Sequence, residues 1–182
     1  MAFDWFASLP NLITIGRLLL TPLVIVMIVY GDWSVAFALF ATASLSDALD
    51  GWLARSFRLQ SELGAVLDPL ADKALIVSVY VTLAIQGVLP PWLAIMVVSR
   101  DLLIIGAVAV AWLVSRPFEV RPHPVSKATT LFQLVLAGAA LAIQVFRWRF
   151  PALEVALLGL VCALTIASAS VYLWFWIKHM RP

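Results

Sequence analysis

Residues 46–75 read SDALDGWLARSFRLQSELGAVLDPLADKAL and place four aspartates in an otherwise apolar part of the chain. Asp47 and Asp50 are three residues apart, and Asp68 and Asp72 are four apart, so each pair lies on one face of a helix. The polar run RSFRLQSE between the pairs is short. The stretch therefore predicts two antiparallel neighbouring helices whose acidic faces meet at one depth.

The composition of the whole chain predicts a membrane protein. The chain has 182 residues, of which 64% are hydrophobic and 12% are charged, and its mean hydropathy is +1.04. A soluble domain is about half apolar and about a quarter charged. Because a membrane-spanning helix needs about 20 apolar residues, six spans with short connections would use nearly the whole length. No block of like charges indicates a nucleic-acid partner.

Turn signals divide the apolar sequence into six predicted spans. Their approximate bounds are residues 11–30, 34–57, 62–86, 91–115, 126–146 and 151–177. The first residues, MAFDWFASL, place aromatic side chains beside an aspartate and predict a short helix lying in the membrane interface. We therefore expect residues 1–182 to form one all-α integral membrane domain with six transmembrane helices, preceded by an interfacial segment over residues 1–9.

Basic residues predict the orientation of this domain. One side of the predicted membrane has seven Lys and Arg residues, which are Arg55, Arg58, Arg116, Arg121, Lys127, Lys178 and Arg181. The other side has Arg147 and Arg149. Cytoplasmic loops carry an excess of Lys and Arg. We therefore expect both termini and the aspartates on the cytoplasmic side of a bacterial inner membrane, with a mitochondrial inner membrane as the alternative.

Four carboxylates at one depth repel one another and need positive charge. A charge at bilayer depth costs at least about 2.5–3.5 kcal/mol, and the nearby Arg55 and Lys73 are too few to balance four anions. Hard divalent cations such as Mg²⁺ bind carboxylate oxygens. Two ions roughly 3.5–4 Å apart are a common arrangement for displacement at phosphorus. The cluster thus predicts a two-metal site, with an internal salt bridge as the alternative.

The aspartates belong to a longer pattern that includes Gly51, Ala54, Arg55 and Gly64. It reads D-x-x-D-G-x-x-A-R-x(8)-G-x-x-x-D-x-x-x-D, in which every fixed position of the CDP-alcohol phosphotransferase signature is present. The chain therefore resembles this family of membrane enzymes. The segments PNLITIGRLLLTP and PVSKATTLFQ extend the resemblance over most of the chain. Taken alone, the glycines would also fit close helix packing, and Arg55 would also fit the cytoplasmic end of a span.

The resemblance implies a reaction and a role for each residue of the pattern. Family members have six transmembrane helices, are usually homodimers, and transfer a phosphatidyl or similar group from a CDP-linked donor to an alcohol, releasing CMP. The residues implied to hold divalent metal, Mg²⁺ or Mn²⁺, are Asp47, Asp50, Asp68 and Asp72. Asp72 is also the implied general base, which removes the proton of the acceptor hydroxyl. The implied nucleotide pocket consists of Gly51, Ala54, Arg55 and Gly64.

Three further cations are candidates to bind the phosphate of the acceptor alcohol, because positions like these line the acceptor pocket in the family. Arg17 and Arg100 lie inside predicted spans, and Lys127 opens the predicted fifth span. Each residue has an alternative role. Arg17 can neutralise an aspartate, Arg100 can pair with the adjacent Asp101, and Lys127 can anchor its helix at the interface.

Finer features favour one acceptor. The segments SRDLLIIGAV, PVSKATTLFQ and TIASASVYLW resemble those of eukaryotic-type cardiolipin synthases, which join CDP-diacylglycerol to phosphatidylglycerol. The alternative branch, phosphatidylglycerophosphate synthase, uses glycerol 3-phosphate and tends to have Glu in place of Asp101 and Lys in place of Thr129. A phosphodiester carries one charge and a phosphomonoester nearly two, so fewer cations favour the diester lipid. A divalent-cation transporter is the alternative from a different class, because it also needs carboxylates among helices.

Overall fold

The computed structural model describes most of the chain and is all-helical over that part. The described residues are 5–57, 62–113, 124–148 and 150–180, and the side chains of residues 5–13, 47–69, 108, 109, 112 and 180 are not included. The helices within these ranges are α1 (Trp5–Tyr30), α2 (Trp33–Phe57), α3 (Glu62–Ile85), α4 (Pro91–Leu113), α5 (Pro124–Phe146) and α6 (Pro151–Met180). Apart from the start of α1, their bounds agree with the predicted spans to within about three residues.

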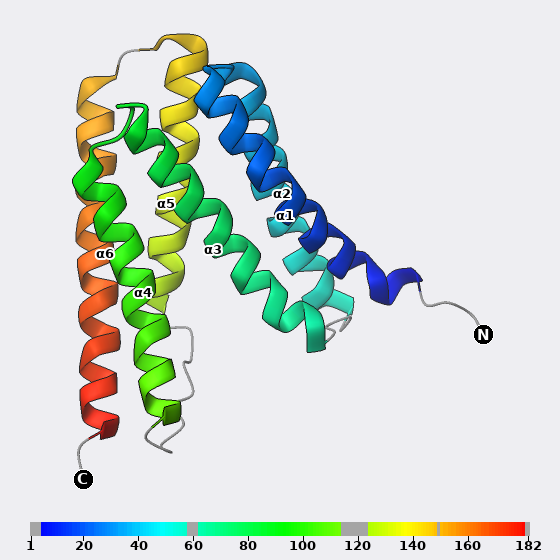
Figure 1. Cartoon of the computed structure of the whole chain (residues 1–182), viewed down its shortest axis with the longest axis vertical. Coiled ribbons are helices and arrows are strands. Elements are labelled where there is room, and N and C mark those ends of the chain that lie inside the picture. Colours follow the sequence, from blue (N-terminus) through cyan, green and yellow to red (C-terminus); the bar gives the residue numbers. More distant parts are fainter. Residues whose placement is uncertain (1–4, 58–61, 114–123, 149, 181–182) are drawn as a thin grey trace.

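The N-terminal segment differs from the prediction. A separate interfacial helix over residues 1–9 was expected, but α1 is continuous from Trp5, and Pro10 lies inside it. Proline lacks the backbone N–H that would bond to the carbonyl of Phe6. The first turns of α1 are bent away from the rest of the helix (Figure 1), which is the usual result of an internal proline. Residues 1–4 lie outside the described part of the chain.

The helices alternate in direction along the bundle. The start of α1 and the end of α6 lie at the lower end of Figure 1, together with the end of α2 and the start of α3. We call this lower end the aspartate end, because Asp47 and Asp50 lie on α2 and Asp68 and Asp72 on α3. The upper end, where α1, α3 and α5 finish, is called the far end. The alternation places the two described ends of the chain at the same end of the molecule.

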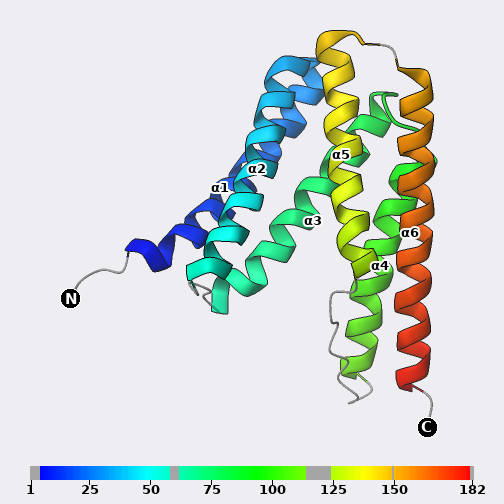
Figure 2. The ribbon, with the colours of Figure 1, turned by 180° about the vertical axis from the view of Figure 1, so that it is seen from behind.

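Two groups of helices make up the bundle. Helix α1 packs against α2 and α3, and α6 packs against α4 and α5, while contacts of α2 with α5 and of α3 with α4 and α5 join the groups. The buried core includes Val24 and Ile28 of α1, Val79 and Leu83 of α3, and Leu93 of α4, all in the half of their helices near the far end. Toward the aspartate end α1, α2 and α3 lean away from α4 and α6 (Figure 2).

The outer surface is strongly apolar. Two helices, Pro124–Phe146 and Pro151–His179, are long and apolar enough to cross a membrane, and Thr14–Tyr30 and Trp33–Ser46 are shorter apolar stretches. Large hydrophobic side chains are exposed along α6, including Leu153. A soluble monomer rarely exposes so much contiguous apolar surface, whereas a helix that is apolar all round is suited to lipid. The structure therefore favours a membrane protein.

Candidate functional site

The aspartates fall on the helices that the sequence predicts. Asp47 and Asp50 lie in the last half of α2, and Asp68 and Asp72 lie near the start of α3. Helix α1 packs against both of these helices. Of the four side chains only that of Asp72 is described, so the predicted metal site itself lies mostly outside the described residues. Within the side chains that are described, no three His, Cys, Asp or Glu residues are grouped as metal ligands would be.

The predicted nucleotide-binding residues lie on the same two helices. Gly51, Ala54 and Arg55 follow Asp50 directly along α2, and Gly64 lies in the first turn of α3. Helical periodicity places Ala54 one turn after Asp50, and Gly64 one turn before Asp68. Their side-chain surroundings are outside the described part of the chain, so the nucleotide pocket stays a prediction.

Arg17 of α1 contacts Asp72 of α3. Arg17 Nη1 donates a hydrogen bond to Asp72 Oδ1 within an ion pair. The Arg17 side chain is only 1% exposed, whereas that of Asp72 is 35% exposed. A buried guanidinium needs an anion close by, because an uncompensated charge away from water is costly. Of the two roles that the sequence leaves open for Arg17, the structure thus shows the pairing with an aspartate.

A small cavity adjoins this ion pair. Its volume is about 30 Å³, and Arg17, Asp72, Ser44 and Thr130 are among its lining residues. These residues come from α1, α3, α2 and α5, so the cavity lies where the two groups of helices meet. The Ser44 hydroxyl is buried and has no hydrogen-bond partner among the described residues. The space is sufficient for a single water molecule, and the polar lining suits one.

A second polar network begins one residue after Asp72. Lys73 forms an ion pair with Asp101 Oδ1, and the same oxygen accepts a hydrogen bond of 2.6 Å from Arg100 Nη1. Arg100 Nη2 donates to Ser126 Oγ at 2.5 Å and to Ser168 Oγ at 2.6 Å. The network therefore ties α3, α4, α5 and α6 together.

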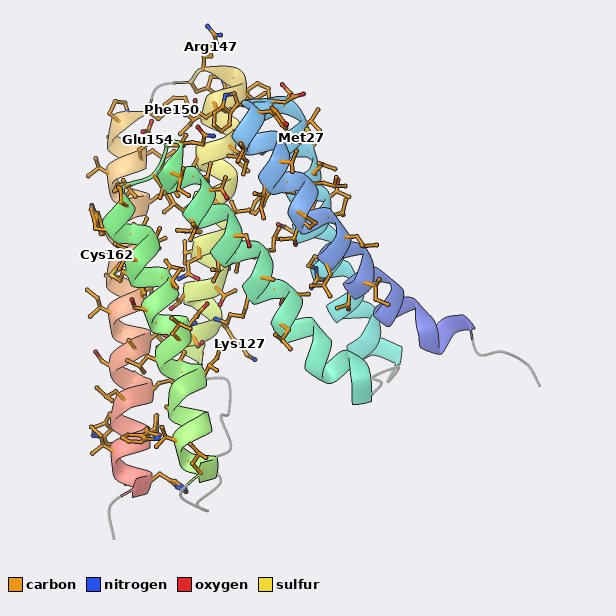
Figure 3. The ribbon with its side chains drawn as sticks, in the orientation of Figure 1. Met27, Lys127, Arg147, Phe150, Glu154 and Cys162 are labelled. Carbon is orange, nitrogen blue, oxygen red and sulfur yellow. The ribbon has the colours of Figure 1, made fainter. Side chains whose placement is uncertain are left out.

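The other two residues predicted to bind the acceptor phosphate differ in burial. Arg100 is buried, and its guanidinium bonds to Asp101, the alternative that the sequence leaves open. Lys127 is exposed at the start of α5, and in Figure 3 it projects from α5 toward α3. Within the described ranges Lys127 forms no ion pair. Arg17 and Arg100 thus each bind a different aspartate, and the role of the three cations at the acceptor phosphate stays a prediction.

Sequence reasoning missed the hydroxyls that hold Arg100 and the partner of Lys73. Ser168 is 68 residues from Arg100, and Asp101 is 28 residues from Lys73. Helical periodicity predicts neighbours three or four residues away and carries no information at such separations. The position of Lys73 directly after Asp72 was the one local signal, since it places a cation beside the proposed base.

Comparison with known proteins identifies the family. The family described as CDP-alcohol phosphatidyltransferase matches residues 7–174. The cardiolipin synthases (CMP-forming) of Rattus norvegicus and Homo sapiens are 35% and 34% identical over 184 residues, which cover 92% of this chain and 60% of each relative. The chloroplastic CDP-diacylglycerol--glycerol-3-phosphate 3-phosphatidyltransferase 1 of Oryza sativa subsp. japonica is 37% identical over 97% of this chain and 59% of that relative.

The chain thus spans about 60% of the length of these three relatives. The family match, in contrast, covers nearly the whole chain and includes all four aspartates of the signature. On this basis the chain belongs to the CDP-alcohol phosphatidyltransferase family.

Proposed function

We propose that this protein is a metal-dependent phosphatidyltransferase that joins CDP-diacylglycerol to phosphatidylglycerol, forming cardiolipin and releasing CMP. The observation that carries this proposal is the complete signature over residues 47–72, at the aspartate end of α2 and α3. The cardiolipin synthases of rat and human among its relatives support the choice of reaction. The glycerol-3-phosphate 3-phosphatidyltransferase of rice supports the same donor with a different acceptor.

The carboxylate ligands that the four aspartates offer fit a pair of divalent metal ions. Asp47, Asp50, Asp68 and Asp72 offer carboxylate oxygens, which Mg²⁺ and Mn²⁺ prefer to nitrogen or sulfur ligands. When bound, two such ions would neutralise the donor pyrophosphate and the charge that develops on the departing CMP. On the same helices, Gly51, Ala54, Arg55 and Gly64 would receive the nucleotide, and the glycines would let it approach the backbone.

Asp72 would accept the proton of the acceptor hydroxyl. Its side chain is one-third exposed, so a lipid hydroxyl can reach it, while Arg17 holds Oδ1 and thereby fixes the orientation of the carboxylate. A general base needs to lie about 2.6–3.2 Å from the hydroxyl that it deprotonates. The terminal glycerol oxygen then bonds to the phosphorus that carries diacylglycerol. The bond from this phosphorus to the bridging oxygen breaks, and the electron pair leaves with CMP.

The state of the buried cations supports a phosphodiester acceptor. Arg17 is paired with Asp72, and Arg100 is paired with Asp101, whose single carboxylate it shares with Lys73. Lys127 is exposed and is not ion-paired within the described residues. Because most of the described cations near the aspartate end are already paired with carboxylates, they suit phosphatidylglycerol, whose phosphodiester carries a single charge, better than glycerol 3-phosphate, which carries nearly two. Lys127 would therefore bind the acceptor phosphate first, and Arg17 and Arg100 would set the local field around it.

The fold suggests how the enzyme sits in its membrane. We propose that all six helices span the bilayer and that the aspartate end faces the cytoplasm, because the basic residues of the sequence gather on that side. Both lipid substrates would then reach the aspartates from the cytoplasmic leaflet. A bacterial or mitochondrial inner membrane fits this orientation, and the family resemblance suggests a homodimer.

The deciding experiment offers two acceptors in parallel. Purified protein in detergent, with Mg²⁺ and labelled CDP-diacylglycerol, is given phosphatidylglycerol in one reaction and glycerol 3-phosphate in the other. We expect cardiolipin and CMP in the first reaction only, and neither product with Asp72→Asn. A lipid product from glycerol 3-phosphate alone would instead identify a phosphatidylglycerophosphate synthase. Divalent-cation flux in liposomes without CMP release would identify a transporter.

A further inference from the structure

An open pocket of about 580 Å³ lies at the far end of the bundle, between the start of α2, the end of α5 and the start of α6. Its lining includes Trp33, Gln144, Arg147, Trp148 and Glu154. Figure 3 shows Arg147 and Glu154 at the upper end of the molecule, far from Lys127 and the aspartate end. The pocket is therefore separate from the candidate active site and would open at the opposite membrane surface.

Glu154 supplies a negative charge in this pocket. It lies in the first turn of α6, where the positive end of the helix dipole stabilises a carboxylate. Its side chain is half-buried. The ion pairs found in the described part of the chain involve Asp72 and Asp101 and not Glu154. A half-buried carboxylate that forms no ion pair with a described Lys or Arg is suited to a cationic group of a ligand.

Two tryptophans contribute aromatic surface beside this carboxylate. Trp148 stacks on Phe146 with ring centroids 4.7 Å apart and planes at 21°, and it meets the ring of Phe150 at 6.1 Å and 63°. These contacts hold the Trp148 ring in place, and Trp33 lines the same pocket from α2. The face of an indole ring attracts cations, and an aromatic lining with a carboxylate is typical of sites for ammonium groups.

Arg147 adds a positive charge at the rim. It follows α5 with a φ of 54°, a left-handed conformation that turns the chain out of the helix. Its side chain is exposed and extends beyond the end of the bundle (Figure 3). An arginine at a membrane surface is well suited to a phosphate group, which it can bind through two N–H donors. The pocket thus combines an anionic, aromatic interior with a cationic rim.

A narrower cavity continues from the pocket toward the middle of the bundle. It has a volume of about 80 Å³ and shares Ile143, Gln144 and Glu154 with the open pocket. Its deeper lining is apolar and includes Leu136 and Leu157 of α5 and α6. The polar opening and the apolar interior match the polarity of a lipid where its headgroup joins its tails.

We propose that this pocket binds the headgroup of phosphatidylethanolamine from the leaflet opposite the active site. The ammonium lies against Glu154 between Trp33 and Trp148, and the phosphate reaches Arg147. Charge complementarity favours a zwitterionic headgroup, which offers one group of each sign, and the primary ammonium of phosphatidylethanolamine can donate hydrogen bonds to Glu154. Phosphatidylglycerol has a phosphate but no ammonium, so the proposed lipid differs from the proposed acceptor. The inference stands independently of the reaction at the aspartate end.

The test measures how much lipid stays bound after extraction. The full chain is reconstituted in bilayers of equal parts phosphatidylethanolamine and phosphatidylglycerol and extracted, and the lipids retained per protein are counted by native mass spectrometry. We expect the protein to retain phosphatidylethanolamine in addition to any phosphatidylglycerol bound at the aspartate end. Glu154→Gln should lower the retention of phosphatidylethanolamine about tenfold, because it removes a charge-assisted hydrogen bond. Asp32→Asn is the matched control. Asp32 caps α2 through the N–H of Val35 at 3.3 Å, and it does not line the pocket.

A second variant and a second readout keep this test decisive. Arg147→Gln should also reduce retention, because the phosphate loses its partner. CMP release measured in phosphatidylglycerol alone should be unchanged by Glu154→Gln, which shows that the variant is folded. Loss of all phosphatidylethanolamine from the unaltered protein during extraction overturns the proposal. So does retention by Glu154→Gln that equals that of the unaltered protein, or an equal loss with Asp32→Asn.

Discussion

Arg17 and Asp72 form an ion pair across α1 and α3 in which the cation is buried and the anion is partly exposed. The two residues are 55 positions apart in the sequence. The pair places the proposed general base against the helix that packs on both acidic helices. It also makes the two partners unequal, because only Arg17 depends entirely on the protein for compensation of its charge.

This inequality predicts unequal costs of removing each partner. Asp72→Ala removes a carboxylate that the buried Arg17 contacts and should destabilise the protein by about 3–5 kcal/mol. Arg17→Met leaves a carboxylate that water can still reach, so its cost should be smaller. The double variant should be more stable than Asp72→Ala alone, because the buried guanidinium is then absent as well. Thermal unfolding in detergent measures all three variants. Equal losses of stability in the two single variants would show that the two partners do not differ in this way.

Arg100 should be sensitive even to a lysine replacement. Its guanidinium donates hydrogen bonds to Asp101, Ser126 and Ser168 at once. The ammonium of a lysine cannot reach all three in the same geometry. We expect Arg100→Lys to destabilise the protein by about 1–3 kcal/mol and Ser168→Ala by about 1 kcal/mol. The measurement is thermal unfolding together with the KM for phosphatidylglycerol. A raised KM with unchanged stability would instead make Arg100 mainly a ligand for the acceptor phosphate.

Lys127 should affect the acceptor and not the donor. Because it is exposed and unpaired within the described residues, Lys127→Gln should leave folding unchanged. Loss of a charge-assisted contact to phosphate is worth about 1.5–3 kcal/mol, so the KM for phosphatidylglycerol should rise roughly tenfold or more. The KM for CDP-diacylglycerol is the internal control and should stay within about twofold. A rise in both constants would place Lys127 near the donor.

Metal removal tests the aspartate cluster directly. EDTA should abolish CMP release, and Mg²⁺ or Mn²⁺ should restore it, because the four carboxylates otherwise repel one another. The same ions should raise the unfolding temperature of the unaltered protein and of Asp32→Asn, whose substitution lies at the far end. They should not do so for Asp68→Asn. Full activity in EDTA, or a metal response that survives Asp68→Asn, would contradict the two-metal prediction.

The fold could be predicted well because it depends on local signals. Apolar runs bounded by glycine, proline and charged residues define the helices, and each of these signals acts within a few residues. The start of α1 is the exception. Aromatic residues beside an aspartate predicted a separate interfacial helix over residues 1–9, but α1 is continuous from Trp5, and Pro10 inside it bends the helix without ending it.

The candidate site could be predicted only in part. The signature over residues 47–72 is local and was recognisable in the sequence. The contact of Arg17 with Asp72 and those of Arg100 with serines on other helices depend on how helices pack, and hydropathy does not encode which polar side chains meet. Ser168 illustrates this limit, because a serine in an apolar helix gives no sign of the arginine on α4 that it binds. The sequence therefore identified the cations but left their partners undecided.

One carboxylate oxygen, Asp101 Oδ1, accepts hydrogen bonds from both Lys73 and Arg100. The two cations differ in how many contacts each would lose on leaving this oxygen. If Lys73, whose side chain is 34% exposed, swings toward an incoming lipid phosphate, an electroneutral Arg100–Asp101 couple remains behind. Departure of Arg100 would instead break its bonds to Ser126 and Ser168 on two further helices. Lys73 can therefore leave Asp101 and supply a positive charge next to the proposed base, Asp72.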